Sequence, residues 1–108
     1  MQIDRTWIFL LMAGALEMGF TTSMKLSEGF TRFPFVASFL AFATLSLFFL
    51  NKSLAGVPMG TAYAVWTGVG ALGTSVIGIV FFHESAGLAR MLMLLALIGS
   101  VVGLKIVS

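Results

Sequence analysis

Long apolar stretches alternate with short polar ones along the whole sequence. The apolar stretches cover residues 7–24, 33–50, 58–82 and 91–107. Each has about the 17 to 25 residues that a helix needs to cross roughly 30 Å of hydrocarbon. The pattern therefore predicts an all-α membrane protein. It has a single domain over residues 1–108, with four transmembrane helices at about 7–25, 33–51, 58–82 and 90–107 joined by short loops.

The boundaries of these helices carry their own signals. Pro34 and Pro58 lie at the start of the second and third predicted helices, where the missing N–H does no harm. The first stretch is not expected to be a cleaved secretory signal, because Glu17 interrupts it and Lys25, rather than a small-residue cleavage site, closes it. Short loops between consecutive helices predict one compact antiparallel bundle.

Composition supports a membrane protein and excludes several other classes. The chain is 59% hydrophobic and 9% charged, with a mean hydropathy of +1.09, far from an ordinary soluble domain. Its basic residues are scattered singly, so no nucleic-acid-binding surface is expected. It has no cysteine for a disulfide or thiolate metal site, and no catalytic or phosphate-binding motif. We therefore expect neither an enzyme nor a metal or cofactor.

The charge balance leaves the orientation in the membrane open. Arg5, Lys52 and Lys105 fall on one predicted side, and Lys25, Arg32 and Arg90 fall on the other. Equal numbers of basic residues on the two sides mean that the positive-inside rule does not fix the direction of insertion. A chain this small is also unlike a complete pore or carrier, so we expect a dimer. Its two copies could insert in opposite directions, or a partner of opposite bias could fix the arrangement.

Glu17 is the strongest functional signal in the sequence. It lies about 15 Å along the helix from Trp7, and so near the middle of the bilayer. A charged carboxylate there costs about 3 kcal/mol on insertion scales and must face protein or water. One interpretation is a protonated acid bonded inside the bundle. The other is a site that exchanges a proton for a cation, because burial favours the neutral acid and a bound cation favours the carboxylate.

The residues around Glu17 fit a binding site. Gly14, one turn before it, lets another helix or a ligand approach the backbone, although plain helix packing explains a glycine equally well. Phe20 and Thr21 share the face of Glu17, three and four residues later, and core packing is the alternative for Phe20. In a dimer, two copies of this carboxylate could share one cavity.

The predicted third helix carries an aromatic pair and many glycines. Tyr63 and Trp66, three apart, project from one face and can stack on a cation, although membrane aromatics often belong to the interfacial belt. Gly68 and Gly70, in the segment GVG, could let the helix bend, and close packing explains them as well.

Features outside these two helices are weaker signals. In the fourth predicted helix, Gly99 and Gly103 form a small-xxx-small pair suited to helix dimerisation. Lys105 is expected to reach the membrane surface with its long side chain. His83 and Glu84 lie in a polar turn and are expected to be solvated loop residues.

Over almost its whole length the chain resembles the small multidrug resistance family of four-helix exporters. The resemblance rests on Glu17 within the first helix, MKLSEGFTR after it, PMGTAYAVWTGVGALG and the late GLK. It implies a dimer, commonly antiparallel, in which the glutamates of both subunits bind a substrate cation and protons in turn.

Residue by residue, Glu17 matches the shared carboxylate of the family. Tyr63 and Trp66 match the aromatics of its binding chamber, and Ser46 matches a serine partner of the glutamate in the guanidinium-exporting subtype. Gly14 also fits that subtype, GVG matches the helix bend, and Gly99 to Gly103 match the dimer-forming region. Phe20 departs from the guanidinium exporters, which typically have tryptophan there, and TTSMKLSEGFTR is more similar to exporters of quaternary ammonium compounds.

The sequence thus predicts a proton-coupled antiporter for small organic cations, guanidinium-type or quaternary ammonium, in a bacterial inner membrane. LEMG and the closing VVGLKIVS also resemble subunits of paired transporters. The alternative is therefore a non-autonomous subunit of a heterodimeric exporter. A passive cation channel is a third possibility, and it predicts flux without a proton gradient.

Overall fold

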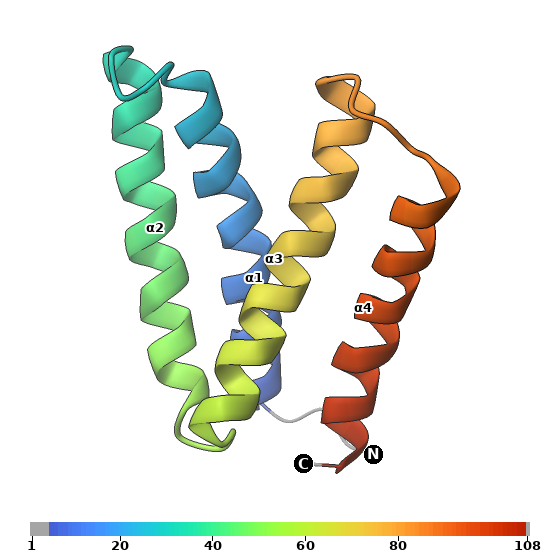
Figure 1. Ribbon diagram of the computed structural model, residues 1–108. Coiled ribbons are helices and arrows are strands. Elements are labelled where there is room, and N and C mark those ends of the chain that lie inside the picture. Colours follow the sequence, from blue (N-terminus) through green and yellow to red (C-terminus); the bar gives the residue numbers. More distant parts are fainter. Residues whose placement is uncertain (1–4, 108) are drawn as a thin grey trace.

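The computed structural model describes residues 5–107, and these fold into four helices joined by short loops (Figure 1). The helices are α1 (Arg5–Leu26), α2 (Phe33–Ser53), α3 (Met59–Phe81) and α4 (Leu88–Val107). Each is long and apolar enough to cross a membrane. The prediction of an all-α chain with four spanning helices is confirmed.

The helix ends differ from the predicted ones by a few residues. The first helix already includes Arg5, and the fourth begins at Leu88 rather than at Arg90. Hydropathy marks the apolar part of a helix, whereas the hydrogen-bonded turns continue into the polar flanks. Pro34 lies in the first turn of α2, and Pro58 comes directly before α3.

Consecutive helices run in opposite directions, so α1 and α3 point the same way (Figure 1). α1 lies between α2 and α3 and packs against both. Glycines on α1 face these neighbours: a Cβ at Gly14 would collide with Val69 of α3, and one at Gly19 would collide with Phe42 of α2. The absence of side chains at these two positions lets all three helices approach closely.

The fourth helix is only loosely attached, which corrects the expectation of one compact bundle. The backbone of α4 lies beside that of α3, and none of the described residues of α4 is buried. Towards its C-terminal end, Leu104 packs on a small core that contains Trp7, Leu10 and Val65. Lipid solvates an apolar face as well as another helix does, so hydropathy alone does not force α4 against the other three.

Candidate functional site

Glu17 lies where α1 and α3 come closest. Its carboxyl group packs directly on the backbone of Gly70, so that a Cβ at position 70 would overlap it. The carboxyl oxygen Oε2 is buried and has no protein hydrogen-bond partner. A buried polar atom is normally hydrogen-bonded, so this oxygen is suited to accept a hydrogen bond from a ligand or water, or to carry a proton.

A hydrogen-bond chain through Ser46 links α2 and α3 to the turn of α1 that carries Glu17. The Ser46 hydroxyl is fully buried and donates to the backbone oxygen of Ala13 at 2.7 Å. The indole N–H of Trp66 donates to Ser46 Oγ at 2.9 Å. In an α-helix, the carbonyl of residue 13 also accepts the N–H of residue 17. Ser46 therefore fixes the ring of Trp66 relative to the backbone at Glu17.

The family resemblance predicts Ser46 as a hydrogen-bonding partner of Glu17. In the structure, the Ser46 hydroxyl donates to the backbone oxygen of Ala13, and Ser46 Oγ accepts from Trp66. A direct role of Ser46 at Glu17 stays a prediction.

Tyr63 and Trp66 form the aromatic side of the site. Their ring centroids are 5.7 Å apart with the planes tilted by 52°. Trp66 is partly buried, whereas Tyr63 is 62% exposed. The two rings lie next to each other on α3, one partly buried and the other exposed, and their role in binding stays a prediction.

Phe20 packs against α2. Its ring meets Phe39 of α2 edge to face at 5.8 Å, and Phe30 contacts the same ring at 5.3 Å. The structure therefore brings Phe20 into an aromatic cluster with α2, consistent with the core-packing interpretation. Its role in binding stays a prediction.

The glycines predicted for a bend and for dimerisation have distinct surroundings. α3 is one continuous helix through Gly68 and Gly70, and a Cβ at Gly68 would collide with Val101 of α4. At Gly99 and Gly103, a Cβ would meet no atom within 4 Å. Close packing thus explains Gly68 and Gly70 here, while the bend and the dimer contact stay predictions.

Two charged residues have more partners than the sequence suggested. Glu84 forms an ion pair with Arg90 at 2.7 Å, and its carboxylate lies over Gly78 of α3, so it is not simply a solvated loop residue. Lys105 lies over the ring of Trp7, 4.7 Å from its centroid. The aromatic ring offers the ammonium group a partner before it reaches the membrane surface.

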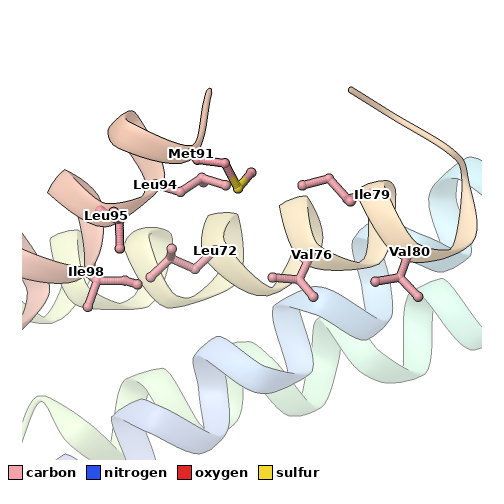
Figure 2. Close-up of a pocket in the computed structure, with 8 residues that line it drawn as sticks. All are labelled: Leu72, Val76, Ile79, Val80, Met91, Leu94, Leu95 and Ile98. Atoms are coloured by element: carbon pink, nitrogen blue, oxygen red, sulfur yellow. The ribbon is translucent and has the colours of Figure 1, made fainter. Parts of the chain in front are cut away.

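A groove of about 380 Å³ between α3 and α4 lies apart from these residues (Figure 2). Side chains from both helices point into it, and all of them are aliphatic or methionine: Leu72, Val76, Ile79, Val80, Met91, Leu94, Leu95 and Ile98. Such a lining offers no acceptor for a cation. The buried carboxyl group of Glu17 lies at the α1–α3 contact instead.

Sequence reasoning missed two features of this site. The sequence offered a bend or close packing for Gly70, but it did not show that the packing partner of Gly70 is the carboxyl group of Glu17. Thr74, one turn further along α3, was not singled out, and its hydroxyl oxygen is buried without a protein partner. No local pattern marks either residue, because each matters only through the helix that packs against it.

The sequence matches a known protein family. The family model described as Small Multidrug Resistance protein matches residues 5–98. The chain belongs to this family. With its four helices that are able to span a membrane, this small multidrug resistance protein is a multi-pass membrane protein.

Its relatives match along nearly the full chain. A protein named "Guanidinium exporter" from Yersinia pseudotuberculosis serotype I (strain IP32953) is 46% identical over 103 residues, which cover 94% of this chain and 98% of the relative. A protein of the same name from Proteus vulgaris is 40% identical, with 95% and 99% covered. One from Citrobacter freundii is 41% identical, with 94% and 96% covered.

Proposed function

We propose that this chain exports guanidinium-type organic cations in exchange for protons, and that both bind in turn at Glu17. Membership of the small multidrug resistance family and relatives named as guanidinium exporters support the broad class, a small-cation efflux transporter. The observation that carries the finer proposal is the Glu17 carboxyl group, which rests on Gly70 with one buried oxygen that lacks a protein partner.

The chemistry of a carboxylate suits both ligands. Guanidinium is a planar cation whose paired N–H groups match the two oxygens of a carboxylate. A proton neutralises the same oxygens, so a cation and a proton compete for one site. Release of either one then requires the arrival of the other, and this competition couples the two movements.

The aromatic pair supports a flat cation as the substrate. The rings of Tyr63 and Trp66 are 5.7 Å apart on α3, the helix that also contacts Glu17. Rings in such a position attract a cation over their faces. The hydrogen bond from Trp66 to Ser46 holds one of these rings in place, so part of the site is formed before the substrate binds.

We propose a dimer as the working unit, in the inner membrane of a bacterium. A dimer contains two Glu17 carboxyl groups, which together can release two protons when one cation binds. Such an exchange moves one net charge, which is worth about 2.3 kcal/mol per 100 mV of membrane potential. The exchange should therefore generate an electrical current.

The proposal is tested by the substitution Glu17→Gln in liposomes that contain the purified chain alone. Guanidinium, phenylguanidinium and tetraalkylammonium ions are perfused in turn, and transport currents are recorded with and without a proton gradient. Glutamine keeps the size of the side chain but cannot release a proton, so the currents should vanish. Glu28→Gln, in the exposed loop after α1, is the matched control and should transport normally.

Other outcomes point to other functions. Proton-driven transport that persists in Glu17→Gln contradicts the proposal. Flux that needs no counter-ion indicates a channel. Silence of correctly inserted wild-type protein indicates the alternative, a subunit that works only with a second homologous chain. Larger currents with tetraalkylammonium than with guanidinium would assign the substrate to the quaternary ammonium class.

A further inference from the structure

A second cavity, of about 60 Å³ and with a mixed apolar and polar lining, lies between α1 and α3, towards the end of both helices where the chain turns into α2 and α4. Its lining differs from that of the apolar groove in Figure 2, because it includes hydroxyl groups and charges. Thr21 and Lys25 line it from α1, Thr74 and Gly78 line it from α3, and Glu84 lines it from the loop that follows.

This cavity continues the Glu17 site towards one face of the membrane. On α1, Thr21 and Lys25 follow Glu17 by one and two turns. On α3, Thr74 and Gly78 follow Gly70 at the same spacing. The two helices run in the same direction, and the cavity lies between them beyond the contact of Glu17 with Gly70, where they move apart towards the loop face (Figure 1).

The inner end of the cavity has hydroxyl groups that can form hydrogen bonds. The hydroxyl oxygens of Thr21 and Thr74 come from opposite helices. Thr21 donates to the backbone oxygen of Glu17 at 2.8 Å, which leaves its lone pairs available. Thr74 Oγ1 and Glu17 Oε2 are both buried without a protein partner. Buried polar atoms normally have a hydrogen-bond partner, and the protein supplies none for these two oxygens. Water molecules in the cavity are therefore the expected partners.

The outer end is charged and lies beside the loop. The backbone N–H of Glu84 bonds to the carbonyl of Gly78 at 3.1 Å, and the Glu84 side chain folds over Gly78 towards Arg90. Lys25 lies over the ring of Phe82, 5.2 Å from its centroid. The carboxylate and the ammonium group line the same cavity, so its mouth is polar and open to hydration.

We propose that this cavity holds a short chain of water molecules that carries protons between the loop face and Glu17, with Thr74 as the residue that positions it. The inference rests on the proposed proton exchange at Glu17. A hydronium ion at the mouth passes its excess proton inward, each water giving up one proton and receiving another. Glu17 changes from carboxylate to carboxylic acid, and neutral water remains at the mouth. A volume of about 60 Å³ holds a few waters, so the route differs from that of an organic cation.

The experiment measures how fast the Glu17 carboxyl proton exchanges with deuterium, without any substrate. The protein in lipid membranes is held at a pH that protonates its carboxyl groups and is then perfused with D₂O. The shift of the carboxyl C=O band is followed by infrared spectroscopy, and the band is assigned by its loss in Glu17→Gln. Thr74→Val removes the hydroxyl but keeps the side-chain shape, and Thr74→Ser restores the hydroxyl.

We expect Thr74→Val to slow the exchange about tenfold, the loss that one hydrogen bond of ordinary strength predicts. Thr74→Ser should exchange at the wild-type rate. Thr44→Val is the matched control, because Thr44 is exposed on α2 and bonds only within its own helix, to the carbonyl of Leu40. Circular dichroism of each variant confirms that the helices are intact.

Equal exchange rates in Thr74→Val and wild type would overturn the water chain, and so would failure of Thr74→Ser to restore the rate. Neither result depends on transport. A wild-type protein that moves guanidinium without protons would overturn the proposed function alone, because the exchange of the carboxyl proton is measured without guanidinium.

Discussion

At the scale of single residues, the carboxyl group of Glu17 has its position because residue 70 is a glycine and has no side chain. Glu17 rests on Gly70, and any larger residue there would occupy the space of the carboxyl group. Because the carboxyl group is the far end of a flexible side chain, it can move away without unfolding the helices. A substitution at Gly70 should therefore affect the function more than the stability.

Gly70→Ala tests this separation. We expect guanidinium transport to fall by about 10- to 100-fold, the loss typical of a reacting group displaced by about 1 Å. The free energy of unfolding should change little. Gly73→Ala is the control, since its Cβ would displace the thioether of Met18 and not the carboxyl group. Normal transport in Gly70→Ala would contradict the assignment of Gly70 as the surface that supports Glu17.

Ser46→Ala tests the hydrogen-bond chain to Trp66. It removes two hydrogen bonds and leaves the indole N–H of Trp66 without its acceptor. We expect a loss of about 1 to 2 kcal/mol in the free energy of unfolding and weaker guanidinium binding, because the Trp66 ring is released. Both are measured in detergent micelles, by denaturant titration and by calorimetry.

Ser53→Ala is the matched control for this prediction. Ser53 is equally buried on α2, but its hydroxyl bonds to Leu50 in the same helix. Its loss should leave guanidinium binding unchanged. Similar binding defects in both variants would mean that Ser46 has no particular link to the site.

At the scale of helices, α3 is packed closely on two sides. Residues two apart on an α-helix point about 200° away from each other. Gly70 accordingly faces Glu17 of α1, while Gly68 faces Val101 of α4. The GVG segment therefore serves two interfaces, and this packing accounts for both glycines whether or not α3 bends during transport.

Gly68→Val should separate α4 from α3 and leave the α1 contact intact. The added side chain would collide with Val101, and overpacking of this kind costs about 1 to 3 kcal/mol. The free energy of unfolding, followed by circular dichroism, should fall by that amount. Gly60→Val is the control, because a Cβ at Gly60 meets no atom within 4 Å. Equal stability of the two variants would contradict a close α3–α4 contact at Gly68.

At the scale of the whole molecule, the single chain leaves one helix largely uncovered. No described residue of α4 is buried, and Gly99 and Gly103 face no other residue of the chain. Small residues one turn apart allow close approach of a second helix. These observations support the proposal that α4 contacts a second copy.

The double substitution Gly99→Leu and Gly103→Leu should weaken the dimer about tenfold, which corresponds to about 1.4 kcal/mol. The bulky side chains prevent close approach of the partner helix, while the fold of each chain is unaffected. Cross-linking in liposomes across a range of protein densities measures the dimer fraction, and transport should fall with it. Gly60→Leu is the control. A dimer fraction that does not change would place the interface elsewhere.

The sequence by itself determined which segments are able to cross the membrane and which residues are candidates for the binding site. Hydropathy specifies four spanning helices because the bilayer requires long apolar segments. A carboxylate in such a segment is costly, which marks Glu17, and helical spacing places Tyr63 and Trp66 on one face. These inferences depend only on local spacing and on the solvent, so they could be made without coordinates.

Only the tertiary structure decided how these residues meet. It placed Glu17 on Gly70, directed Ser46 to Ala13 rather than to Glu17, and turned Phe20 towards α2. It also placed most of α4 beside α3, with a contact to α1 near the C-terminal end of α4. In lipid, burying an apolar helix face against another helix brings no hydrophobic free energy, because the lipid is apolar as well. Hydropathy therefore does not specify which helix faces are in contact. Shape and hydrogen bonds between distant segments decide the contacts, and a one-dimensional pattern does not contain them.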